Sequence, residues 1–108
     1  MAPGSHTSNA LESIAGYARL ELFGAGVEPI AVIENKPDSA ASLQIYYHVS
    51  LKWGGIGPAA AARALELYGD LAEEAQQKPG KYPDIDRLYQ IIRQDEYYSV
   101  RCYPKEGP

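Results

Sequence analysis

The clearest alternation of hydrophobic and polar positions runs from Leu43 to Trp53. Apolar side chains occupy every second position of this stretch, which is the period of a β-strand. We therefore predict a strand over residues 43–53 with one apolar face. The opposite face would carry Gln44, Tyr46, His48, Ser50 and Lys52.

Two shorter segments also have the pattern of strands. Residues 30–34 are apolar and rich in β-branched side chains, and a Pro-Asp-Ser turn signal follows at residues 37–39. Residues 97–103 alternate again and end before Pro104. Short β-rich runs bounded by turn residues are typical of strands, so we predict a strand at each segment.

The first part of the chain fits a helix, with one alternative. Apolar residues recur at helical spacing from Leu11 to Leu22, and Asn9 with Glu12 three residues later has the form of a capping box. A glycine after Phe23 would end this helix. Residues 17–23 also fit a strand, and both interpretations remain open.

Two proline residues mark the starts of later helices. Pro58 suits the first position of a helix, because its missing N–H has no partner there. The alanine-rich segment after it predicts a helix to about Gln77, ahead of Pro79 and Gly80. Pro83, followed by Asp84 as a cap, begins another segment whose apolar residues recur at helical spacing.

These elements predict an α+β fold in the order α-β-β-α-α-β, with helices packed on one face of a small antiparallel sheet. A chain of 108 residues has room for one core, and we place the domain at residues 11–108. Residues 1–10 are small and polar and contain tag-like tripeptides, so we expect a tag-derived or disordered segment.

Composition narrows the classes of partner. The net charge of −4 disfavours nucleic acid and anionic membrane surfaces, which are bound by clustered Lys and Arg. The chain has no apolar run of membrane-spanning length, and we expect a cytoplasmic protein. Cys102 is the only cysteine, which excludes an intrachain disulfide. We expect no cofactor and no metal site, since no metal-ligand spacing is present.

The segment Gly55-Ile-Gly57-Pro-Ala-Ala60 matches the glycine spacing of dinucleotide-binding loops. Such folds need a second parallel strand after the helix, whereas here another helix is predicted. We therefore favour a tight turn that the glycines permit. A weaker alternative is that the N–H groups of Gly55, Ile56 and Gly57 bind a small anion beside the helix N-terminus.

The polar face of the long predicted strand is the main candidate for a ligand site. If the last strand pairs with it, hydroxyl, imidazole and guanidinium groups would share one surface that suits a carboxylate or proton transfer. The candidate residues are Tyr46, His48, Ser50, Tyr97, Arg101 and Tyr103. The plainer interpretation is that any one-sided sheet has a polar outer face. Cys102 alternates with Arg101 and is expected to point inward.

Two functions of different class remain. The first is a non-enzymatic binding or interaction protein that acts as a homo-oligomer, which the surplus of nine tyrosines and the alanine-rich helix favour. The second is a small-molecule-binding protein or enzyme that uses the Tyr/His/Arg face. Convergence of Tyr46, His48 and Arg101 in a concave pocket would favour the second function.

Overall fold

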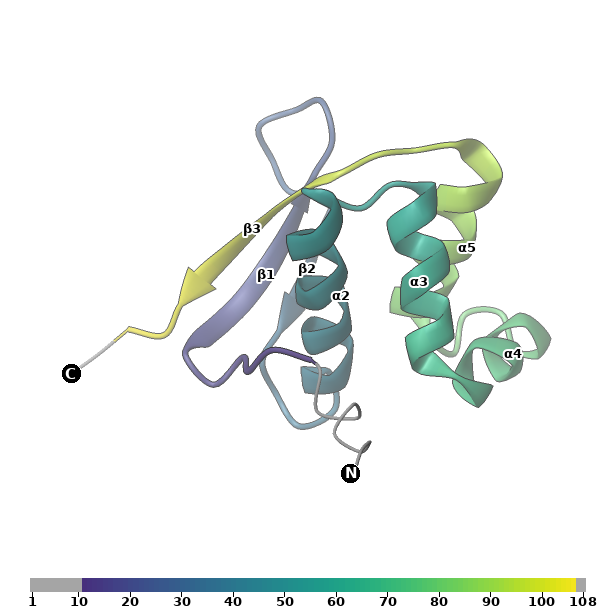
Figure 1. Cartoon of the computed structure of the whole chain (residues 1–108), viewed down its shortest axis with the longest axis horizontal. Coiled ribbons are helices and arrows are strands. Elements are labelled where there is room, and N and C mark those ends of the chain that lie inside the picture. The colour runs from purple at the N-terminus through teal and green to yellow at the C-terminus, as the bar shows by residue number, and fades with distance from the viewer. Residues whose placement is uncertain (1–10, 107–108) are drawn as a thin grey trace, which may run out of the picture.

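A three-stranded antiparallel sheet in the order β2-β1-β3 forms one side of the molecule, and helices form the other (Figure 1). This arrangement comes from a computed structural model that describes residues 11–106. The fold is α+β, as predicted, although the order of its elements differs from the prediction. The elements are β1 (Tyr17–Phe23), β2 (Ala31–Glu34), α2 (Ala40–Trp53), α3 (Pro58–Tyr68), α4 (Asp70–Gln77), α5 (Pro83–Gln94) and β3 (Ser99–Pro104).

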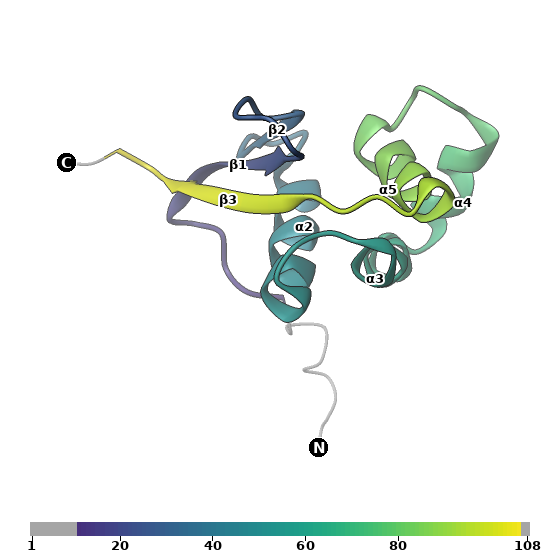
Figure 2. The same cartoon turned by 90° about the horizontal axis from the view of Figure 1, so that it is seen from above.

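Within residues 11–106, α2 makes the main helical contact with the sheet, and α3 and α5 continue the helical layer away from it (Figures 1 and 2). The opposite face of the sheet has no helix over it within residues 11–106. The core lies between the sheet and α2 and extends between α2, α3 and α5. Its fully buried members include Leu20, Leu22, Tyr46, Ile56 and Leu88. The prediction of helices on one face is therefore correct for α2.

The predicted helix over residues 11–22 is wrong, because the second half of that segment is strand β1. Leu20 and Leu22 are fully buried, whereas Arg19 and Glu21 alternate with them on the open face. Pairing with β2 on one side and β3 on the other supplies β1 with main-chain partners. The strand alternative for residues 17–23 is thus confirmed. The proposed cap, Asn9, and the expected tag-derived segment lie outside the described residues.

The predicted strand over residues 43–53 is also wrong, because this segment is helix α2. The alternation counted Tyr46 as polar, yet Tyr46 is fully buried, while Leu51 and Trp53 are 54% and 39% exposed. Burial follows a helical face through Leu43, Tyr46 and Val49. Gly54 ends the helix in the left-handed conformation, with φ 77°, and its N–H donates to the carbonyl of Ser50.

The single helix predicted from Pro58 to about Gln77 is two helices, α3 and α4, separated at Gly69. Gly69 has φ 65° and ψ −131°, a backbone conformation that residues with a Cβ rarely adopt. Its N–H bonds to the carbonyls of Leu65 and Glu66, which closes the last turn of α3. The chain therefore changes direction here, and α4 packs against α5.

We expect Gly69→Ala to lower the free energy of unfolding by at least about 1 kcal/mol, because alanine is strained at this φ and ψ. Gly57→Ala is the matched control, since Gly57 has φ −111° and its added Cβ would meet only the exposed side chain of Tyr97 closely. Urea unfolding measures both variants. Equal losses for the two variants would contradict a special role of Gly69.

The other predicted elements are confirmed with small changes in their bounds. The strand expected over residues 30–34 is β2, and the strand expected over residues 97–103 is β3. The helix expected after Pro83 is α5, although Tyr82 rather than Asp84 holds the N-cap position. No helix within residues 11–106 combines the length and the apolar character needed to cross a bilayer.

Candidate functional site

The residues of the predicted polar strand face lie on different sides of α2. Tyr46 points into the core, where its hydroxyl donates to the carbonyl of Asp84 at 2.6 Å. His48 points to the N-terminal segment, with its Nδ1 2.8 Å from the carboxylate of Glu12. This contact lowers the pKa of Glu12. Ser50 donates to the carbonyl of Tyr47 one turn earlier. These positions result from the helical rather than extended backbone.

The remaining predicted site residues lie elsewhere. Arg101 and Tyr103 are on the open face of the sheet, where Arg101 stacks over Phe23 at 5.3 Å. Tyr97 lies beside the glycine loop, and its hydroxyl donates to the carbonyl of Gly54 at 3.0 Å. The structure therefore does not bring Tyr46, His48 and Arg101 together, and they form no common pocket.

The glycine loop, residues 54–57 between α2 and α3, is bonded through main-chain groups to the segment just before β3. The N–H of Ile56 donates to the carbonyl of Tyr98 at 2.8 Å, and the N–H of Tyr98 donates to the carbonyl of Ile56 at 3.0 Å. The N–H of Ile56 is therefore not free for an anion. A Cβ on Gly55 would overlap the ring of Tyr97, so this glycine allows a close approach. These contacts fit the turn interpretation of the loop.

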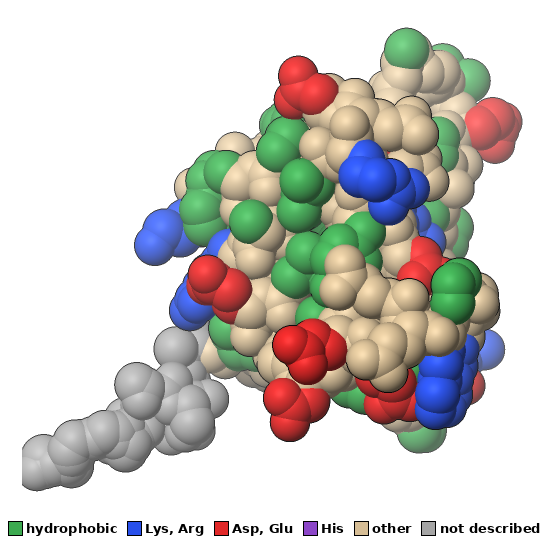
Figure 3. All heavy atoms as spheres, turned by 90° about the vertical axis from the view of Figure 1, so that its right-hand side faces the viewer, with side chains coloured by type: hydrophobic (Ala, Val, Ile, Leu, Met, Phe, Trp, Pro, Cys, Tyr) green, Lys and Arg blue, Asp and Glu red, His purple; other side chains and the backbone are tan. Residues whose placement is uncertain are grey.

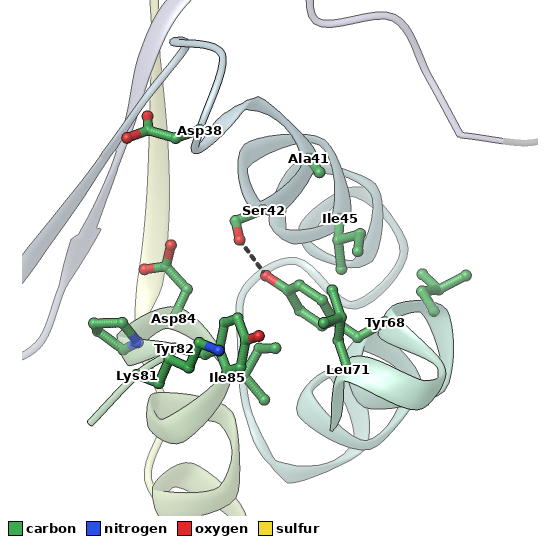
Figure 4. Close-up of a pocket in the computed structure, with 12 residues that line it drawn as sticks. Asp38, Ala41, Ser42, Ile45, Tyr68, Leu71, Lys81, Tyr82, Asp84 and Ile85 are labelled. Carbon is green, nitrogen blue, oxygen red and sulfur yellow. Dashed lines mark hydrogen bonds between the residues drawn. The ribbon is translucent and has the colours of Figure 1, made fainter. Parts of the chain in front are cut away.

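A pocket of about 400 Å³ lies where α2, α3, α4 and the start of α5 meet (Figure 4). Helix α2 contributes Ser42 and Ile45, and the end of α3 contributes Tyr68. Leu71 of α4 and Tyr82 before α5 complete the opposite wall. The other lining residues are Asp38, Ala41, Leu67, Lys81, Pro83, Asp84 and Ile85.

A pair of hydroxyl groups forms one polar point of the pocket wall. The hydroxyl of Tyr68 donates a hydrogen bond to Oγ of Ser42 (Figure 4). Burial raises the pKa of the Tyr68 phenol, so the phenol stays protonated and remains a donor at neutral pH. The Ser42 hydroxyl keeps its own proton available for a ligand, because no acceptor for that proton occurs within residues 11–106.

The charged groups along the pocket are unevenly compensated. The carboxylate of Asp84 forms an ion pair with the guanidinium of Arg87 at 3.1 Å. The ammonium of Lys81 forms an ion pair with the carboxylate of Glu74 at 3.3 Å. Asp38 has no ion pair or hydrogen bond to another described residue. Figure 4 shows Asp38 and Asp84 along the same side of the pocket. Asp38 is therefore the pocket carboxylate that a cationic ligand can pair with directly.

A family model described as "Uncharacterized protein conserved in bacteria (DUF2322)" matches residues 5–102. The chain belongs to the DUF2322 family. The matched range covers every helix that the structure describes, strands β1 and β2, and most of β3. No curated protein and no solved structure matches the chain.

In this DUF2322 chain the polar wall of the pocket is supported from the core. Arg87 donates to the Tyr46 hydroxyl at 3.0 Å as well as to Asp84, and its side chain is 18% exposed. Tyr46 in turn donates to the main-chain carbonyl of Asp84. These three residues fix the first turn of α5 against α2, which holds the Asp84 carboxylate in place.

The surface that carries α3, α4 and α5 has interspersed charges of both signs. Figure 3 shows acidic and basic side chains scattered among hydrophobic ones over this side of the molecule. No single sign covers this face, so the local groups of the pocket decide which ligand the pocket accepts. Within residues 11–106, no group of three His, Cys, Asp or Glu side chains could hold a metal ion.

Sequence reasoning missed the pocket because its walls come from three separate segments of the chain, residues 38–45, 67–71 and 81–85. No motif links Ser42, Tyr68 and Asp84 in the sequence. The surplus of tyrosines was a partial signal, since Tyr favours half-wet positions such as pocket walls. Tyr68 and Tyr82 occupy such positions.

Proposed function

We propose that this DUF2322 protein binds a small molecule with a protonated amino group and a compact apolar body in the pocket between α2, α3, α4 and α5. The observation that carries the proposal is the carboxylate of Asp38, which lines a largely apolar cavity and has no ion pair or hydrogen bond within residues 11–106. Ligand sites commonly combine such apolar walls with a few polar groups that fix orientation.

The pocket walls suit both parts of such a ligand. Ile45, Ile85 and Leu71 offer aliphatic surface to the apolar body. The rings of Tyr68 and Tyr82 offer aromatic surface, which attracts cations as well as apolar groups. A volume of about 400 Å³ is near the lower end of the range for small-molecule sites, so the ligand is compact.

The hydroxyl pair favours binding over nucleophilic catalysis. A serine becomes a nucleophile when a neighbouring base accepts its proton. Here Tyr68 donates a hydrogen bond to Ser42, and the raised pKa keeps the phenol protonated, so Tyr68 is not a phenolate base for Ser42. Ser42 is thus arranged to donate a hydrogen bond to a ligand while it accepts one from Tyr68.

We expect phenethylamine to bind the pocket and 2-phenylethanol, which lacks the charge, to bind at least several-fold more weakly. At roughly 0.5 kcal/mol for each non-hydrogen atom, the nine-atom amine would bind with a dissociation constant of about 0.5 mM. Amide chemical shifts in ¹H–¹⁵N NMR measure binding. Shifts should concentrate at Ser42, Tyr68 and Asp84.

Two pairs of variants test the site. Asp38→Asn should weaken binding of the amine but not of the alcohol, and Asp70→Asn, an exposed α4 aspartate outside the pocket, should change neither. Ala41→Phe should fill the pocket and abolish binding of both, whereas the exposed Ala62→Phe should not. Equal affinity for the amine and the alcohol, or shifts away from the pocket, would contradict the proposal.

A further inference from the structure

We infer that two copies of this chain associate through the free edges of their β3 strands. The two strands pair antiparallel about a twofold axis at Cys102, and the two sheets together form one sheet of six strands. Strand β3 is one of the two outer strands in the sheet order β2-β1-β3, so one of its edges has no partner strand within residues 11–106. Unpaired edges are templates for pairing with another chain. This inference is independent of the ligand pocket.

The direction of the main-chain groups shows which part of the edge is free. The N–H groups of Ile30 and Asn35 donate to the carbonyls of Leu22 and Ala18. The main-chain N–H and C=O groups of the even-numbered residues of β1 therefore point toward β2. Because direction alternates along a strand, the odd-numbered residues of β1 bond to β3. Their partners in β3 are Ser99, Arg101 and Tyr103. The N–H and C=O groups of Val100 and Cys102 therefore point outward.

One end of this edge is already occupied within the chain. Tyr98 has the same main-chain direction as Val100, and its N–H and C=O groups bond to Ile56. Figure 2 shows the course of β3 past the end of α2, beyond which the strand continues to its C-terminal end. A partner strand therefore has the segment from Val100 to Pro104 available.

Pairing centred on Cys102 uses most of the free main-chain groups of this segment. Cys102 would exchange two main-chain bonds with Cys102 of the partner subunit. The N–H of Val100 would donate to the carbonyl of Pro104 in the partner, and the reverse bond follows by symmetry. Because Pro104 has no N–H, the carbonyl of Val100 stays without a main-chain donor in each subunit.

The side chains of the open face favour this register over its neighbour. With the axis at Cys102, Arg101 lies directly opposite Tyr103 of the partner subunit, and the row across both sheets reads Glu34, Arg19, Tyr103, then Arg101 and Glu21 of the partner. Each cation then has an aromatic ring or a carboxylate beside it. With the axis at Arg101, two arginines would face each other.

The contacts within one chain already use the same chemistry. Arg19 lies over the ring of Tyr103 at 4.1 Å, and Arg101 lies over the ring of Phe23 at 5.3 Å. Pairing at Cys102 would extend this arginine–aromatic arrangement across the twofold axis without placing like charges opposite each other. The second copy is therefore the occupant that the edge fits.

Cys102 is the only cysteine, which allows a direct test of the register. In the inferred dimer the two Cys102 Cα atoms lie about 5.5 Å apart. A bismaleimide with a two-carbon spacer should therefore cross-link the protein as a dimer. In the double variant C102S/S99C the thiols would be about 20 Å apart, because six residues at ~3.4 Å separate them from their symmetry mates. This variant should not be cross-linked, although residue 99 is more exposed.

Sedimentation equilibrium from about 10 μM to about 1 mM measures the association itself. We expect a monomer–dimer equilibrium whose dissociation constant rises roughly tenfold in Arg101→Gln, through loss of the contact with Tyr103 of the partner subunit. Arg93→Gln, on the exposed side of α5, should leave the constant unchanged. A monomer at all concentrations, an unchanged constant in Arg101→Gln, or equal cross-linking of the S99C variant would overturn the inference.

Discussion

Replacement of Ile56 by Ala should lower the free energy of unfolding by about 3 kcal/mol. Ile56 is fully buried in the core cluster, and removal of such a side chain loses transfer free energy and leaves a cavity. Its main-chain bonds to Tyr98 are unaffected by the substitution, so the loss reports the side chain alone. Denaturant unfolding monitored by circular dichroism measures the change.

Ile92→Ala is the matched control, because Ile92 is 39% exposed on α5 and should contribute less than about 1 kcal/mol. The difference in stability loss between Ile56→Ala and Ile92→Ala tests whether the glycine loop anchors α3 to β3. A turn that anchors α3 to β3 requires Ile56 in the core, whereas a loop specialised for an anion would tolerate alanine there. An unchanged stability of Ile56→Ala would contradict the anchoring role.

The sequence predicts elements best where local residues alone determine the backbone. Pro83 begins α5 and Pro58 begins α3, because proline fits the first turn of a helix. The α2 segment has two periodicities at once, and periodicity alone does not decide between strand and helix. Its C-terminal signals, Lys52 in the last turn and Gly54 after it, favour a helix and outweigh the apparent alternation.

The predicted site depended on that one incorrect assignment. A strand would place Tyr46, His48 and Ser50 on one surface, whereas successive residues of a helix turn away from each other. Arg101 and Tyr103 do share the open face of β3, because their segment is a strand as predicted. The pocket around Ser42 and Tyr68 depends on how three chain segments meet, and sequence spacing does not encode that contact.

Replacement of Tyr46 by Phe should lower the free energy of unfolding by about 2 kcal/mol. The substitution keeps the ring but removes a hydroxyl that donates to the carbonyl of Asp84 and accepts from Arg87. Both partners are partly buried, and hydrogen bonds to charged groups contribute about 1.5–3 kcal/mol. Tyr89→Phe is the control, because its half-buried hydroxyl makes one bond to the carbonyl of Ala72 and should contribute about 1 kcal/mol or less.

The pH dependence of stability gives Tyr46 a second, independent readout. Burial raises the pKa of Tyr46, so the folded chain keeps the phenol proton at a pH where the unfolded chain releases it near its ordinary pKa of about 10. The native state then binds more protons than the unfolded state, and stability falls as pH rises above that value. One such group contributes a slope of up to about 1.4 kcal/mol for each pH unit. Urea unfolding between about pH 9 and pH 11 should therefore show a shallower alkaline decline in Tyr46→Phe than in the unsubstituted chain. Equal slopes in Tyr46→Phe and the unsubstituted chain would mean that the Tyr46 hydroxyl is not held in the core.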